Sequence, residues 1–220
     1  MNVFDRSKHV YISPDLEEVI KDTIRFFNGT PVHSIPIPKR FHGTGVYALY
    51  CIAKSGVYSK FHSVNRTEFC MPIYIGKAVP KGWRQARLLS STDTKVYELN
   101  NRIKEHSRNI NLGDGLNISD FFCRFMILEG KESDLIGTIE AALIRKYKPI
   151  WNTLIDGFGN HDPGKGRYKQ AKSDWDVCHP GRAWAEKCQG VSADKEILFQ
   201  SIKKFLNNLN EEMEIKYTHI

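Results

Sequence analysis

The pattern of apolar and polar residues along the chain predicts a mixture of helices and short strands. Apolar side chains recur at helical spacing in four stretches, residues 13–29, 96–110, 133–147 and 193–209. Three shorter runs are rich in Val, Ile, Tyr and Phe, as strands are: residues 45–53, 73–76 and 121–128. The chain is therefore expected to be of the α+β class, with the first two strands joined by a long polar loop.

The ends of these elements carry their own signals. Ser13 is a candidate N-cap of the first helix, and Pro14 suits its first turn. Ser133 is expected to begin the third helix, which Pro149 stops. Three prolines within residues 31–38 favour an extended connection between the first helix and the first strand.

The organisation along the chain suggests three parts that pack as one unit. Residues 1–44 form an N-terminal helix and extended arm, and residues 45–156 form the core. Residues 157–220 form a basic, glycine-rich segment followed by a C-terminal helix. Within that part, residues 157–190 show little periodicity, and so long a loop is usually functional or disordered.

Composition narrows the class of protein. Of the 220 residues, 41% are hydrophobic and 26% are charged, which is typical of a soluble globular protein. The net charge of +7 favours an anionic partner, with nucleic acid ahead of membrane. The polar N-terminus and the lack of a membrane-spanning stretch of about 20 apolar residues suggest a cytoplasmic protein. Free thiols in a reducing compartment are expected from the five cysteines, which form no C-x-x-C pair.

Side chains able to cut a phosphodiester are spread along the core. Two predicted strands carry Gly45-Val46-Tyr47 and Tyr74-Ile75-Gly76. Arg102 and His106 are four residues apart, so they share one face of a helix. The complete set of candidate catalytic residues is Tyr47, Tyr74, Arg102, His106, Glu140 and Asn152.

Each candidate suits one task in hydrolysis of a phosphodiester. Glu140 would hold a divalent cation, Mg²⁺ or alternatively Mn²⁺, and Arg102 would neutralise phosphate charge. Tyr47 would either deprotonate the attacking water or only orient a metal-bound hydroxide. The first role requires lowering a phenol pKa from about 10 to about 8, which takes roughly 2.7 kcal/mol of preferential stabilisation. Asn152 would take part in the chemistry or brace the loop after the helix.

The two tripeptides, followed in order by Arg102, Glu140 and Asn152, resemble the signature of the GIY-YIG nuclease superfamily. The step from Arg102 to His106 and the segments 158–167 and 175–182 are most similar to type II restriction endonucleases of the Eco29kI group. This resemblance implies a small three-stranded antiparallel sheet flanked by helices, Mg²⁺, and a homodimer that cuts a GC-rich palindrome, CCGCGG. The long loop at residues 54–70 departs from the usual superfamily spacing.

Basic residues outside this set are candidate contacts to double-stranded DNA, and arginine in particular can read guanine. They are Lys77, Arg84, Arg87, Lys165, Arg167, Lys169 and Arg182. A solvated basic face is the alternative for the group near Lys77. A nicking repair or homing nuclease, or a non-catalytic DNA-binding protein on the same scaffold, remain alternatives for the whole chain.

Overall fold

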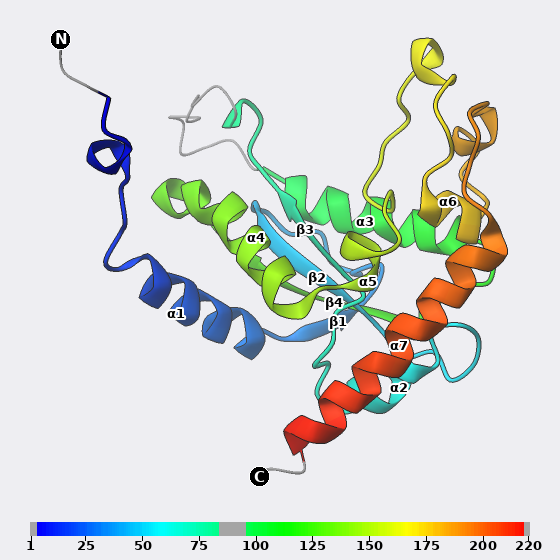
Figure 1. The fold of residues 1–220 in the computed structure, drawn as a ribbon, viewed down its shortest axis with the longest axis horizontal. Coiled ribbons are helices and arrows are strands. Elements are labelled where there is room, and N and C mark those ends of the chain that lie inside the picture. Colours follow the sequence, from blue (N-terminus) through cyan, green and yellow to red (C-terminus); the bar gives the residue numbers. More distant parts are fainter. Residues whose placement is uncertain (1–3, 84–95, 218–220) are drawn as a thin grey trace.

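The computed structural model describes residues 4–83 and 96–217, and a four-stranded antiparallel sheet lies at its centre (Figure 1). The strands are β1 (Val32–Ser34), β2 (Gly45–Cys51), β3 (Tyr74–Ala78) and β4 (Phe121–Ile127). Their order across the sheet is β1-β4-β2-β3, so β1 and β3 are the edges.

The expectation of a three-stranded sheet is wrong by one strand. Residues 32–34, which lie within the expected extended connection, pair with residues 122–124 of β4. The prolines at positions 31, 36 and 38 enforce an extended backbone, but the four residues between Pro31 and Pro36 keep their backbone N–H groups. That short run therefore completes the sheet at the edge of β4.

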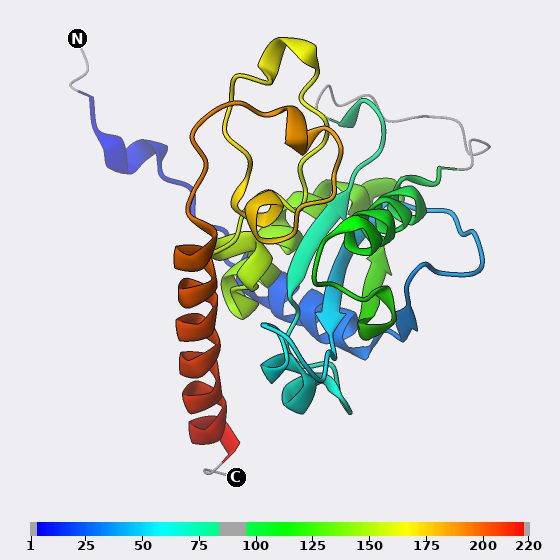
Figure 2. The ribbon, with the colours of Figure 1, turned by 90° about the vertical axis from the view of Figure 1, so that its right-hand side faces the viewer.

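Helices cover both faces of the sheet (Figure 2). One face packs against α1 (Leu16–Gly29) and α4 (Ile136–Tyr147). The opposite face packs against a larger cluster that takes residues from all three parts of the sequence. Its helices are α2 (Lys60–Asn65), α3 (Glu98–Leu112), α5 (Ile150–Thr153), α6 (Asp174–Cys178) and α7 (Lys195–Tyr217).

The predicted alternation of β2 is confirmed. Tyr47, Leu49 and Cys51 belong to the cluster on the α3 side, whereas Val46, Ala48 and Tyr50 belong to the cluster on the α4 side. Since every residue of β2 is buried, both faces of this central strand are covered. The face on which Tyr47 lies is thus fixed by packing along the whole strand.

Several helix boundaries differ from those expected. The first helix begins at Leu16 with Asp15 as its N-cap rather than Ser13. Ser133 lies in a 3₁₀ turn, η4 (Gly130–Leu135), that precedes α4. There its hydroxyl donates to the carbonyl of Gly130, 2.7 Å away, instead of capping α4. The last helix runs to Tyr217, beyond the expected end at residue 209.

Residues 157–190 are ordered around buried aromatic side chains. Phe158 and Trp175 are fully buried in the larger cluster, which ties this part of the chain to the core. Beyond these anchors, residues 162–172 project from the body as a loop that we call the basic finger (Figures 1 and 2). It contains η5 (Lys165–Arg167) and is joined to residues 189–190 by backbone hydrogen bonds.

Across residues 4–83 and 96–217, no helix combines the length and the apolar character needed to cross a bilayer. Within the same ranges no disulfide joins the cysteines.

Candidate active site

The two motif tyrosines lie side by side on the α3 face of the sheet. Tyr47 on β2 is the register partner of Gly76 on β3, and the ring centroids of Tyr47 and Tyr74 are 6.2 Å apart. A Cβ atom on Gly76 would lie 2.4 Å from the hydroxyl oxygen of Tyr47. Glycine is therefore required at this position because the Tyr47 phenol lies directly over the backbone of β3.

The Tyr47 hydroxyl meets a buried histidine from α3. Tyr47 Oη lies 2.6 Å from Nε2 of His106, a residue with no exposed surface. Burial lowers the pKa of His106 well below its usual range, and burial raises the pKa of Tyr47 well above 10. Both groups are consequently neutral near pH 7.

The direction of that hydrogen bond follows from the other ring nitrogen. Nδ1 of His106 is buried without a partner in the described residues. A buried N–H without an acceptor is costlier than a buried acceptor without a donor. The tautomer protonated on Nε2 is therefore favoured, so His106 donates to Tyr47 and leaves the Tyr47 proton to point elsewhere in the site.

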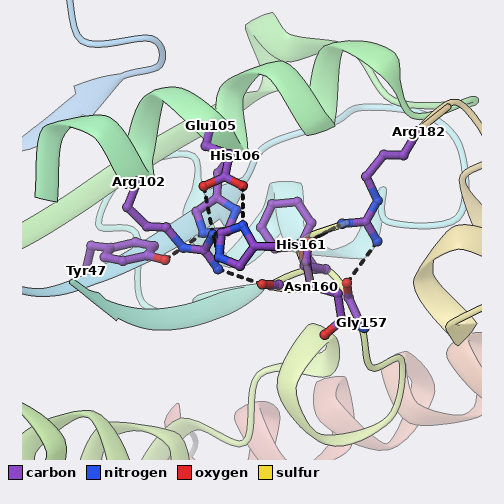
Figure 3. Close-up of polar contacts among 10 residues, drawn as sticks. Tyr47, Arg102, Glu105, His106, Gly157, Asn160, His161 and Arg182 are labelled. Atoms are coloured by element: carbon purple, nitrogen blue, oxygen red, sulfur yellow. Dashed lines mark hydrogen bonds and ion pairs between the residues drawn. The ribbon is translucent and has the colours of Figure 1, made fainter. Parts of the chain in front are cut away.

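Arg102 lies one helical turn before His106 and is held by three neighbours (Figure 3). Its Nη1 donates to Oε2 of Glu105 and to Nε2 of His161, each at 2.8 Å. Its Nη2 donates to the carbonyl oxygen of Gly159 at 2.6 Å. The guanidinium also opposes the effect of burial, because its charge lowers the pKa of both phenols.

The site includes a segment to which the sequence assigned no role. Phe158 stacks on His106, with ring centroids 4.5 Å apart, and Gly159 and His161 contact Arg102. A Cβ atom on Gly159 would lie 2.6 Å from the Tyr74 hydroxyl, so only glycine lets this backbone approach. The resemblance of residues 158–167 was the signal available in the sequence, but it did not distinguish these roles.

Glu140 approaches from the other side of β3. By strand alternation Lys77 faces α4, while Tyr74 and Gly76 face α3. There the ammonium group of Lys77 forms an ion pair with Oε2 of Glu140. After the dominant effect of burial, the charge of Glu140 also raises the pKa of Tyr74. The carboxylate therefore acts electrostatically on the tyrosine cluster across the edge strand.

The sequence that forms this site matches a known protein family. The family model described as the Eco29kI GIY-YIG domain matches residues 39–206. The chain belongs to this family. A search among curated proteins gave no match. The Eco29kI family supports a restriction-type DNA endonuclease, and the match spans β2, β3 and β4, both tyrosines, Arg102 and the segment after residue 157.

GIY-YIG nucleases typically use a divalent metal, and the donors in this structure fit one. Among the described residues no three His, Cys, Asp or Glu side chains converge as a metal site. Glu140 is a partly exposed carboxylate already paired with a cation, Lys77. A single carboxylate suits Mg²⁺, which keeps several waters and binds substrate phosphate. Glu140 would thus hold the metal, which would supply positive charge for the phosphate.

In this GIY-YIG domain Asn152 braces the edge strand. Its side-chain oxygen accepts from the backbone N–H of Ile75 at 2.8 Å. Its side-chain nitrogen donates to the carbonyl of the same residue at 2.8 Å. These two bonds replace a neighbouring strand along β3, so the bracing alternative is the one that this geometry favours.

The expectation that Arg182 contacts DNA does not agree with its position. Arg182 is 2% exposed, and all five of its N–H groups are used. Two bind the carboxylate of Asp176, and three bind the carbonyls of Gly157, Phe158 and Asn160. A guanidinium with no remaining donor cannot read a base or hold a phosphate, so its role is to fix the loop.

The remaining basic candidates have different surroundings. Lys165, Arg167 and Lys169 are exposed on the basic finger, and no acid pairs with them in the described residues. Lys77 instead points to Glu140. Arg84 and Arg87 lie outside the residues that the structure describes.

Proposed function

We propose that this Eco29kI-family domain is a sequence-specific endonuclease that cuts both strands of a GC-rich palindrome, CCGCGG, with one Mg²⁺ ion per active site. Mn²⁺ would be able to replace Mg²⁺. The observation that carries the proposal is the meeting of Tyr47, Tyr74 and Arg102 beside the buried His106, on elements distant in the sequence. Such a cluster has no evident purpose in stabilising a fold, because burying these polar groups is costly.

The proposed chemistry divides the work among these side chains. Arg102 neutralises charge that develops on the phosphate, a role for which its planar fork of donors is suited. Tyr47 orients the attacking water through a neutral hydroxyl. To act as the general base instead, the phenol would first have to release its own proton to solvent, which a bound metal and Arg102 would favour by lowering its pKa. Burial alone opposes the second role, since it raises that pKa.

The proposed assembly follows from the substrate. A palindrome presents two equivalent strands, so a homodimer with one site per strand is the simplest solution. The net charge of +7 and the exposed cations of the basic finger suit a polyanionic substrate such as DNA. The cytoplasm is the compartment in which we propose that this nuclease works.

Purified protein incubated with supercoiled plasmid and Mg²⁺ tests the proposal, with EDTA and the Glu140→Gln variant as controls. We expect linear fragments whose sequenced ends all fall at one palindrome. Nicked circles without linear product would indicate the monomeric nicking alternative. Intact plasmid with both Mg²⁺ and Mn²⁺, despite DNA binding, would indicate the non-catalytic alternative and contradict the proposal.

A further inference from the structure

Residues 157–161 form a strap whose backbone lies between two arginine side chains (Figure 3). On one side, Arg182 binds the carbonyls of Gly157, Phe158 and Asn160. On the other side, the carbonyl of Gly159 accepts from Arg102. The buried arginine therefore fixes the shape of the strap, and the strap presents the carbonyl of Gly159 to the arginine of the active site.

The last residue of the strap completes this arrangement through its side chain. Arg102 can only donate, so Nε2 of His161, 2.8 Å from Nη1, must accept. Nδ1 of His161 therefore carries the proton and donates to Oε1 of Glu105 at 2.8 Å. Since Oε2 of Glu105 also accepts from Nη1 of Arg102, the three side chains form a closed ring of hydrogen bonds.

This ring decides which donors of Arg102 can reach a substrate. Glu105 and His161 use both N–H groups of Nη1, and Gly159 uses one of Nη2. The N–H groups that remain are on Nε and Nη2. Nη2 lies beside the Tyr74 phenol, because a Cβ atom on Gly159 would lie 3.5 Å from Nη2 and 2.6 Å from the Tyr74 hydroxyl. The ring thus fixes the orientation of the guanidinium without using all of its N–H groups.

We propose that His161, acting with Glu105, is a positioning residue for Arg102, and that it links the orientation of this arginine to the basic finger. The proposal rests on the proposed function, because Arg102 is taken there to stabilise the phosphate. His161 is the last residue before the finger, so contacts of Lys165 or Arg167 with DNA act on the same short segment that holds Arg102. DNA bound in the wrong register on the finger would leave the guanidinium misplaced.

Steady-state kinetics and metal-free DNA binding of His161→Ala test the proposal. We expect kcat to fall about 10- to 100-fold, as small misplacements of catalytic groups do. KM and the metal-free Kd should stay within about 2-fold, because the residue acts through Arg102 and not on DNA. His161 is 66% exposed, so the variant should fold normally. His9→Ala, which removes an exposed histidine from the N-terminal arm, is the matched control and should cleave as the unmodified protein does.

A conservative variant and a double-mutant cycle separate positioning from a general structural effect. His161→Gln offers an amide oxygen to Arg102 and an amide N–H to Glu105, so kcat should recover to within about 3-fold of the unmodified value. In an Arg102→Lys background, which lacks the fork, adding His161→Ala should change kcat by less than about 2-fold. An equal loss in both backgrounds would overturn the proposal, as would a large rise in Kd, which would indicate direct contact with DNA.

A further measurement does not depend on cleavage. The Nη1 protons of Arg102 should exchange slowly with solvent in ¹⁵N NMR spectra of the free protein and rapidly in His161→Ala. Equal exchange in both proteins would show that His161 does not hold the guanidinium. If the unmodified protein binds DNA and shows slow exchange but never cleaves, the proposed function fails, whereas normal cleavage by His161→Ala refutes only the positioning role.

Discussion

Arg182 and Asp176 form a buried ion pair beneath the strap, with Nε and Nη2 of the arginine each 2.7 Å from a different carboxylate oxygen. The guanidinium carbon also lies 4.7 Å from the ring centroids of both Trp175 and Trp184. These contacts and the three carbonyl bonds give the strap one conformation. The pair thus acts on the active site only through the strap, whose Gly159 carbonyl binds Arg102.

Arg182→Ala should lower the free energy of unfolding by about 3–5 kcal/mol, because it leaves the Asp176 carboxylate buried and unpaired. Urea denaturation followed by fluorescence of the neighbouring tryptophans measures this loss. Lys169→Ala on the exposed finger is the matched control and should change stability by no more than about 0.5 kcal/mol. An Arg182→Ala protein of unchanged stability that binds DNA weakly would instead restore the original expectation of a DNA contact.

Tyr47→Phe should slow cleavage by about 10²- to 10⁴-fold, since it removes only the hydroxyl that we propose to orient or deprotonate the attacking water. Single-turnover cleavage at saturating protein measures the chemical step. Tyr50→Phe is the control, because Tyr50 is equally buried in β2 but lies on the opposite face of the sheet. A normal rate for Tyr47→Phe would remove this phenol from the chemistry.

Glu140→Gln should abolish cleavage while leaving DNA affinity without metal within about 2-fold. The amide keeps the size of the side chain but lacks the charge that a divalent cation requires. Fluorescence anisotropy with labelled duplex and calorimetric titration with Mn²⁺ separate the two properties. Full activity in this variant would refute the metal-binding role.

The extent to which the sequence predicts this site depends on how local each signal is. Alternation along β2 places Tyr47 on the correct face, and helical spacing brings Arg102 and His106 together, because both patterns arise within one element. The strand at residues 32–34 is too short for any period and forms only because β4 offers it an edge. Arg182 is buried by tertiary contacts, whereas its glycine-rich surroundings suggest an exposed cation. Pairings between distant segments have no local signature.

Lys165→Ala should weaken DNA binding and reduce its salt dependence. Loss of one phosphate contact lowers the slope of log K against log salt by about 0.9, because one fewer counterion is released. Anisotropy titrations between 50 and 200 mM salt, on the palindrome and on an unrelated duplex, measure this change. An equal loss on both duplexes indicates a phosphate contact, and a loss only on the palindrome indicates a base contact. No change on either duplex would exclude Lys165 from the interface.

Stability should fall between pH 6 and pH 5 because two buried histidines resist protonation. Burial lowers the pKa of His179 to about 4 and lowers that of His106 well below its usual range. Each histidine takes up a proton near pH 6.5 in the unfolded chain but not in the folded protein, so its stabilising contribution is complete above pH 6.5. Below that pH the contribution is lost by about 1.4 kcal/mol per pH unit for each histidine.

Urea denaturation at closely spaced pH values measures the slope, and the window above pH 5 keeps most carboxylates out of it. His179→Asn should reduce the slope by about one histidine's share, even though loss of the bonds to Tyr58 and Asp114 lowers stability at every pH. His9→Ala removes an exposed histidine, and its slope should match that of the unmodified protein. If His179→Asn leaves the slope unchanged, His179 does not exclude its proton in the folded state, and the neutral form inferred for these buried rings is wrong.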